Sequence, residues 1–156
     1  LSATFKAEYA RTSFDEDSKA LFARVAVRNT GNYPASVPLY VAVTNISDPT
    51  VRVLNPAGTL ADGTPYYDFT GLVSGGVSRL EPNAATGQLD LTFAAPGRKR
   101  FTYDLVFLGV LNRPPTFTTS PVLEASPDRS YRYDVDASDP DGDPLRYTLV
   151  SGPQGM

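Results

Sequence analysis

Apolar and polar residues alternate with a period of two along most of the first 110 residues, and proline and glycine interrupt the alternation every ten residues or so. Successive side chains of a β-strand point to opposite faces, so this pattern predicts strands that are buried on one side. The chain contains no convincing stretch with the 3.6-residue period of a long helix. We expect strands over residues 4–10, 21–28, 37–43, 51–54, 66–69, 89–93 and 101–107.

The segment 21–28 gives the clearest strand pattern. Leu21, Ala23, Val25 and Val27 occupy one face, and the other face carries Phe22, Arg24, Ala26 and Arg28. Seven or eight strands of this kind before Leu111 suit one immunoglobulin-like sandwich of about 100 residues. The predicted fold class is therefore all-β, beginning with an immunoglobulin-like β-sandwich.

The composition changes at Leu111-Asn112-Arg113-Pro114-Pro115. Two consecutive prolines remove two amide donors and fix φ, so this segment should be extended and stiff. We therefore predict a sandwich over residues 1–111, a linker over 111–115 and a second unit over 112–156. In the second unit we expect strands at 117–123, 131–138 and 145–149.

The second predicted unit is too short to be a complete sandwich. Three strands in about 45 residues bury little apolar surface and leave strand edges unpaired. We expect either that the unit was cut from a longer polypeptide or that strands of another chain complete it. The start at Leu1 rather than at methionine favours an internal or processed segment.

An acidic loop lies between the last two expected strands. Asp139, Asp141 and Asp143 alternate around Gly142, and carboxylates this close repel one another unless a cation or water separates them. Calcium accepts six to eight oxygen ligands in irregular loops. Antiparallel strands would return this loop toward the linker, where the amide oxygen of Asn112 could join. We predict a Ca²⁺ site that stiffens the junction; a solvated turn is the alternative.

Composition excludes several functions. The 156 residues include no cysteine and no histidine, so disulfides, thiolate metal sites and histidine-dependent catalysis are impossible. The net charge is −3 and the basic triplet 98–100 is short, which argues against nucleic acid as a partner. No apolar run approaches the roughly 18 residues that a membrane span needs. We expect no enzymatic activity and no membrane insertion.

Aromatic residues suggest one further ligand. Planar rings stack on sugars, so exposed tyrosines could line a carbohydrate-binding face. The candidates are Tyr9, Tyr33, Tyr40, Tyr66 and Tyr67. The alternative is that these rings cover a sandwich edge or core with the hydroxyl in water.

The second unit resembles the first half of a bacterial cadherin-like or putative-Ig repeat. The resemblance lies in Asn112-Arg113-Pro114-Pro115-Thr116-Phe117, in the segment 131–145 with its Asp-Pro-Asp-Gly-Asp-Pro run, and in 147–156 with its Gly-Pro-Gln-Gly-Met ending. Such repeats recur in tandem in secreted and surface proteins. The resemblance implies that Asp139 and Asp141 bind calcium at the junction with the preceding domain. It also matches Asn112 to a linker ligand and Glu124 to the acidic residue near the end of the first strand.

The first unit resembles, more loosely, an immunoglobulin-like module of large secreted bacterial proteins. The resemblance lies in the segments 51–58, 80–84, 89–93 and 101–105. Together the two resemblances imply a non-enzymatic structural or adhesive module, such as a spacer, stalk or filament subunit, of a secreted or surface-attached bacterial protein. Its partners would be neighbouring domains or subunits. The alternative is a carbohydrate- or protein-binding module attached to a secreted enzyme or adhesin.

Overall fold

The computed structural model describes residues 4–73, 78–124 and 126–152, and these form an all-β protein with antiparallel sheets. Within these ranges there is no α-helix, only the 3₁₀ turn η1 (Thr70–Leu72). Accordingly, no described helix is long and apolar enough to cross a membrane. The chain divides into two compact units, Leu1–Asn112 and Arg113–Met156.

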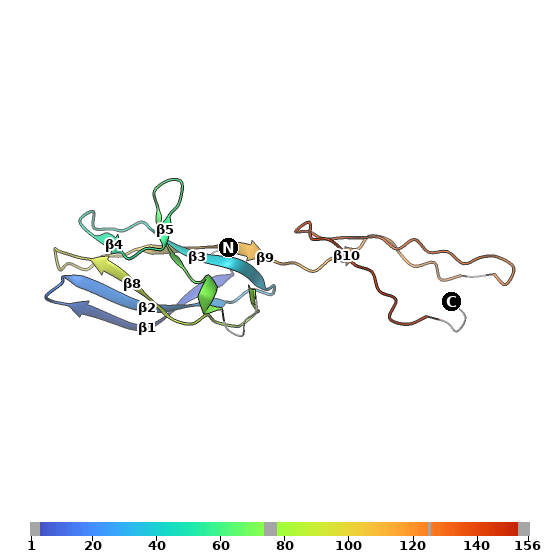
Figure 1. Ribbon diagram of the computed structural model, residues 1–156, viewed down its shortest axis with the longest axis horizontal. Coiled ribbons are helices and arrows are strands. Elements are labelled where there is room, and N and C mark those ends of the chain that lie inside the picture. Colours follow the sequence, from blue (N-terminus) through green and yellow to red (C-terminus); the bar gives the residue numbers. More distant parts are fainter. Residues whose placement is uncertain (1–3, 74–77, 125, 153–156) are drawn as a thin grey trace. The chain divides into compact units, whose positions relative to one another are not determined.

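Sheet A of the first unit has the strand order β1-β2-β8-β4, with every neighbour antiparallel. The strands are β1 (Phe5–Asp15), β2 (Ala20–Asn29), β8 (Leu89–Ala94) and β4 (Arg52–Leu54). A register shift between Tyr9 and Arg11 interrupts the β1–β2 pairing. Figure 1 shows β1, β2 and β8 lying side by side in one layer.

Sheet B is built around β3 (Ala35–Thr44). One edge of β3 pairs with β9 (Asp104–Leu111) along most of its length. The other edge pairs with β6 (Pro65–Asp68) and, further toward Ala35, with β7 (Arg79–Leu80). The short β5 (Gly58–Thr59) extends the sheet beyond β6.

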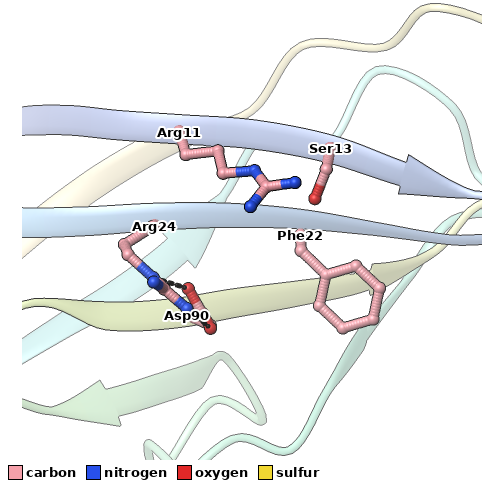
Figure 2. Close-up of a pocket in the computed structure, with 5 residues that line it drawn as sticks. All are labelled: Arg11, Ser13, Phe22, Arg24 and Asp90. Carbon is pink, nitrogen blue, oxygen red and sulfur yellow. Dashed lines mark hydrogen bonds and ion pairs between the residues drawn. The ribbon is translucent and has the colours of Figure 1, made fainter.

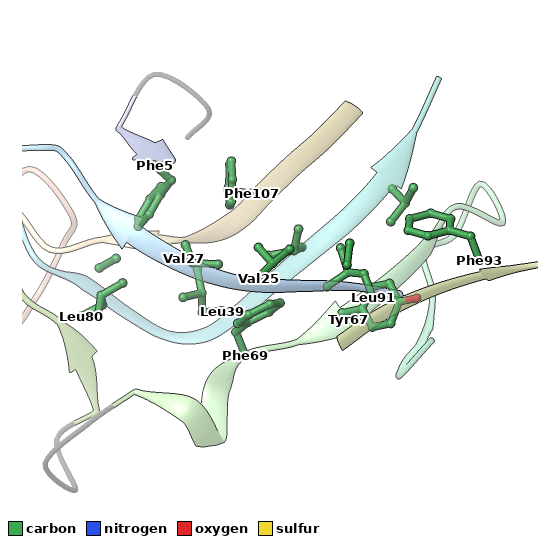
Figure 3. Close-up of a cluster of buried hydrophobic side chains, with 14 of the residues drawn as sticks. Phe5, Val25, Val27, Leu39, Tyr67, Phe69, Leu80, Leu91, Phe93 and Phe107 are labelled. Atoms are coloured by element: carbon green, nitrogen blue, oxygen red, sulfur yellow. The ribbon is translucent and has the colours of Figure 1, made fainter. Parts of the chain in front are cut away.

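The two sheets pack their apolar faces together (Figure 3). Sheet A contributes the β2 and β8 residues that alternate inward, and sheet B contributes the corresponding residues of β3 and β6 together with Phe69. Fully buried side chains include Val25, Val27, Leu39, Val41, Tyr67, Phe69, Leu91 and Phe93. Burying a large apolar side chain contributes about 1.5–3 kcal/mol, so this layer is the main source of stability.

Strand β1 begins and strand β9 ends at the same end of the sandwich of the first unit (Figure 1). Phe5 at the start of β1 pairs with Asn29, and Leu111 at the end of β9 pairs with Ala35. The N–H of Thr30 donates to the carbonyl of Thr4 at 2.8 Å. The β1–β2 turn and the loop between β8 and β9 lie at the opposite end.

The sequence predicted most strands of the first unit. Those expected at 21–28, 37–43, 51–54, 66–69 and 89–93 are confirmed within two residues at each end. The strand expected at 101–107 instead begins at Asp104, because the backbone of Thr102 bonds to the loop residue Ser47. Phe101 still faces inward and packs on Phe93, with ring centroids 5.6 Å apart.

The three strands expected in the second unit were wrong over most of their length. Among its described residues only β10 (Thr116–Phe117) and β11 (Ala137–Ser138) form, and they pair with each other. Apolar side chains there stay exposed, including Phe117 at 74% and Leu149 at 72%. Apolar and polar residues do alternate in this unit. Within residues 113–124 and 126–152, however, no second sheet covers the apolar side chains, so their burial does not stabilise longer strand pairs. The Pro-Gln-Gly-Met part of the ending on which the resemblance partly rests, residues 153–156, lies outside the described residues.

Candidate functional site

A row of charged side chains crosses the outer face of sheet A. Arg11 of β1 lies opposite Arg24 of β2, and Arg24 lies opposite Asp90 of β8. In the adjoining row Ser13 lies opposite Phe22. Figure 2 shows these five side chains around a shallow hollow of about 230 Å³.

Arg24 and Asp90 form a two-pronged ion pair. Nε of Arg24 donates to Oδ1 of Asp90 at 2.8 Å, and Nη2 donates to Oδ2 at 2.7 Å. These hydrogen bonds, helped by the charges of Arg24 and Arg11, hold the pKa of Asp90 below its ordinary value. Asp90 is therefore ionised at neutral pH. The pair is half-exposed, so it contributes at most about 1 kcal/mol to stability.

Arg11 gives this row an excess positive charge. Like charges opposite each other on a sheet are unfavourable, and Asp90 balances only one of the two arginines. Among the described ion pairs, none joins Arg11 to a carboxylate. The Arg11 guanidinium extends over β2 toward Ser13 (Figure 2). The row can therefore attract an anionic group while Asp90 still offers acceptor oxygens.

The acidic loop of the second unit forms a tight turn. Oδ1 of Asp139 accepts the backbone N–H of Asp141 at 2.8 Å and that of Asp143 at 3.3 Å. Gly142 has a φ of 78°, which residues with a Cβ rarely adopt, so glycine is required here. The Asp139 carboxylate thus acts as the cap of the turn.

Asp141 is held by Arg113, which belongs to the same unit. The guanidinium donates to Oδ1 of Asp141 from Nε at 3.0 Å and from Nη2 at 2.8 Å, and the Arg113 backbone N–H donates to Oδ2. Nη2 also donates to the carbonyl of Pro140 at 2.8 Å. The Arg113 side chain is the main cause that lowers the pKa of Asp141.

These contacts bear on the predicted calcium site. In the part of the chain that the structure describes, no three acidic side chains gather closely enough to hold a metal. Asp141 already receives a positive charge from Arg113, and Asn112 belongs to the first unit, where its N–H donates to the carbonyl of Pro34. Glu124 is exposed and lies outside any strand. The loop as arranged therefore lacks a ready calcium ligand set, and the calcium site stays a prediction.

The five candidate tyrosines do not form one flat face. Tyr67 is buried in the core. Tyr40 and Tyr66 contact each other on the outer face of sheet B, with ring centroids 4.8 Å apart and planes tilted by 44°. Tyr9 and Tyr33 are exposed on other segments. Tilted rings on separate elements cannot stack together along one saccharide.

A second hollow, of about 510 Å³, lies where the β1–β2 turn meets the loop before β9. Its apolar part includes Phe14, Leu21 and Phe101, and its rim carries the basic triplet 98–100. Arg98 is already paired with Glu16 at 2.9 Å. Lys99 and Arg100 leave this rim with an excess of two positive charges, whereas the row on sheet A has an excess of one.

Comparisons with protein-family models, with curated proteins and with solved structures find no match for this chain. The candidate site therefore rests on its own geometry. The sequence had placed Phe22 and Arg24 on one face of a strand, which was the available signal. It could not reveal Arg11 and Asp90 as their neighbours, because that depends on the register of three strands distant in sequence.

Proposed function

We propose that this chain is a non-enzymatic, immunoglobulin-like structural and adhesive module of a secreted or surface-attached bacterial protein, and that its first unit is the adhesive part. The observation that carries the proposal is that β1 begins and β9 ends at the same end of the sandwich. The chain therefore does not run through this unit lengthwise. Such a unit adds little length to a stalk. Its sheet faces, and the end that carries the β1–β2 turn, are then available to bind a partner.

Strand order supports the immunoglobulin-like assignment. In that fold one sheet has the order A-B-E-D, in which the first two strands are followed by a later and then an earlier one. Sheet A has the same arrangement, β1-β2-β8-β4. The pairing of β3 with β9 corresponds to strands C and F. Sheet B departs from the usual order by carrying β6 and β7 on the other edge of β3.

A calcium-binding acidic loop remains a subsidiary proposal. It is supported by the three aspartates that alternate around Gly142 in the turn. A calcium ion there would have to replace the guanidinium of Arg113.

Carbohydrate binding is the second candidate function, in a module attached to a secreted enzyme or adhesin. The row of Arg11, Arg24 and Asp90 favours it over protein binding, because side chains that both donate and accept hydrogen bonds suit sugar hydroxyls.

Multivalent display tests the adhesive function. Beads coated with the full chain of 156 residues would be passed over surfaces bearing neutral polysaccharides, acidic polysaccharides and extracellular matrix proteins. Many copies per bead raise weak binding to a measurable level. We expect retention on at least one surface above that of uncoated beads. Retention on none of them, or cleavage of any polysaccharide by the chain, would contradict the proposal.

A further inference from the structure

We infer that the outer face of sheet A binds a saccharide that carries a carboxylate, namely a uronic-acid unit of an acidic polysaccharide. This inference rests on the proposed adhesive function and narrows it to one class of ligand. The side chains that carry it are Arg11, Ser13, Phe22, Arg24 and Asp90.

Arg11 would receive the carboxylate. Its guanidinium matches a carboxylate with two parallel N–H donors. Arg24 already uses Nε and Nη2 on Asp90, so the charge that attracts the ligand comes from Arg11. Both arginines lie on neighbouring strands at the same register position, which fixes where the negative group is most favourable.

Asp90 and Ser13 select sugar over other anions. The Asp90 carboxylate keeps acceptor lone pairs beyond those that Arg24 occupies, and the Ser13 hydroxyl can donate or accept. Sugar hydroxyls can donate hydrogen bonds to the Asp90 carboxylate and can exchange them with the Ser13 hydroxyl. The side-chain carboxylates of an acidic peptide come with no hydroxyl groups for Asp90 and Ser13 to bind, and a nucleic acid needs several unbalanced cations rather than one.

Phe22 supplies the apolar contact. Figure 2 shows its ring beside the Arg24–Asp90 pair, with Ser13 above it. The apolar C–H face of a sugar ring can pack on such an aromatic surface while its hydroxyls reach the polar row. The hollow of about 230 Å³ is smaller than the roughly 300–1,000 Å³ of pockets for drug-sized ligands. It therefore suits one sugar unit of a longer chain.

Affinity electrophoresis of the full chain tests the inference. The gel would contain polygalacturonate, its fully methyl-esterified form, or polyglutamate, at about 0.15 M salt so that distant charges are screened. We expect retardation by polygalacturonate alone. The methyl ester keeps the sugar but loses the charge, and polyglutamate keeps the charge but loses the sugar. Equal retardation by polyglutamate would overturn the inference, since simple charge attraction would then suffice.

Two substitutions separate this site from general charge effects. Arg11→Gln should weaken binding to polygalacturonate about tenfold, because one charge-assisted contact is lost. Arg79→Gln is the matched control: it removes the same charge from sheet B, where Arg79 pairs with Glu81 at 2.6 Å, and should bind as the unmodified chain does. Arg11 is exposed, so the variant should fold, which circular dichroism would verify.

The outcomes distinguish this inference from the function on which it rests. Unchanged binding by Arg11→Gln, or an equal loss in Arg79→Gln, would reject the site. If the beads described above adhere to neutral sugars or proteins but the chain ignores polygalacturonate, the inference fails and the adhesive function stands. If nothing is bound in either experiment, both fail.

Discussion

At the scale of single residues, the hydroxyl of Tyr67 joins the two sheets of the first unit. Its oxygen accepts the N–H of Thr92 at 2.9 Å and lies 2.8 Å from the carbonyl oxygen of Leu54, to which it can donate. Tyr67 belongs to β6 of sheet B, whereas Thr92 and Leu54 belong to sheet A. One buried polar group therefore links β6 of sheet B to β4 and β8 of sheet A.

Replacing Tyr67 with phenylalanine should lower the free energy of unfolding by about 1–3 kcal/mol, because the buried N–H of Thr92 loses its acceptor. Denaturant unfolding would measure this change. Tyr40→Phe is the control, since that ring lies on the outer face of sheet B, and it should change stability much less. Equal stability of Tyr67→Phe and the unmodified chain would mean that the hydroxyl contributes nothing to the joining of the sheets.

Alkaline pH should destabilise the first unit. Burial raises the pKa of Tyr67 to about 12 from an ordinary value of 10, and burial is also the main cause that raises the pKa of Tyr103. Between pH 10 and 12 the folded chain keeps protons that the unfolded chain releases, so stability is complete below pH 10 and falls as the pH rises through 12. Between pH 10 and 12 the free energy of unfolding should fall less steeply for Tyr67→Phe than for the unmodified chain. A flat profile would contradict the prediction.

Asn29 has a role that sequence reasoning could not reveal. It is the buried last residue of β2. Its side-chain amide donates to the carbonyls of Tyr33 at 2.8 Å and Leu80 at 3.0 Å, and its oxygen accepts the N–H of Gly31 at 2.9 Å. Asparagine is common both in turns and in such bridges, and only the partners distinguish them.

At the scale of strands and loops, alternation predicted the elements that are buried on one side. The strand expected at 4–10 nevertheless continues to Asp15, because the polar residues after Tyr9 pair with β2 and place their side chains on the outer face. The second unit shows the opposite error, since alternating residues there did not form ladders. A strand requires a partner as well as a pattern, and the pattern alone does not identify the partner.

The acidic loop gives a prediction at this scale. Arg113→Gln removes the guanidinium that competes for Asp141. If calcium binds the loop, the amide resonances of Asp139 and of residues 141–143 should shift saturably at millimolar calcium, and at lower calcium in Arg113→Gln than in the unmodified chain. Arg132→Gln is the control, because Arg132 pairs with Asp134 at 3.0 Å outside the loop. Unmoved resonances in both chains would reject the calcium site.

At the scale of the whole molecule, the two units differ in how well they are packed. The first has two sheets around a buried core, whereas the second has one ladder of two residue pairs among its described residues. Hydrogen exchange should therefore be slow for amides in β2, β3 and β8 and fast over most of 118–124 and 126–136. Slow exchange throughout these two segments would contradict the prediction.

The candidate site on sheet A is formed by residues from three strands, so the sequence could reveal only part of it. The pattern placed Phe22 and Arg24 on one face, and the aspartates of the loop could be recognised from spacing alone. To predict the charged row, one would also have to know how the strands are aligned, because Arg11 lies opposite Arg24 and Arg24 lies opposite Asp90. The pairing of Asp141 with Arg113 likewise joins residues far apart in the chain.

The central claim is that the outer face of sheet A is the binding surface of this protein. The most direct measurement is a map of amide resonance shifts in the full chain as short oligogalacturonates are added. We predict that the largest shifts fall at Arg11, Ser13, Phe22, Arg24 and Asp90. Shifts centred on the outer face of sheet B, or no shifts at saturating ligand, would contradict it.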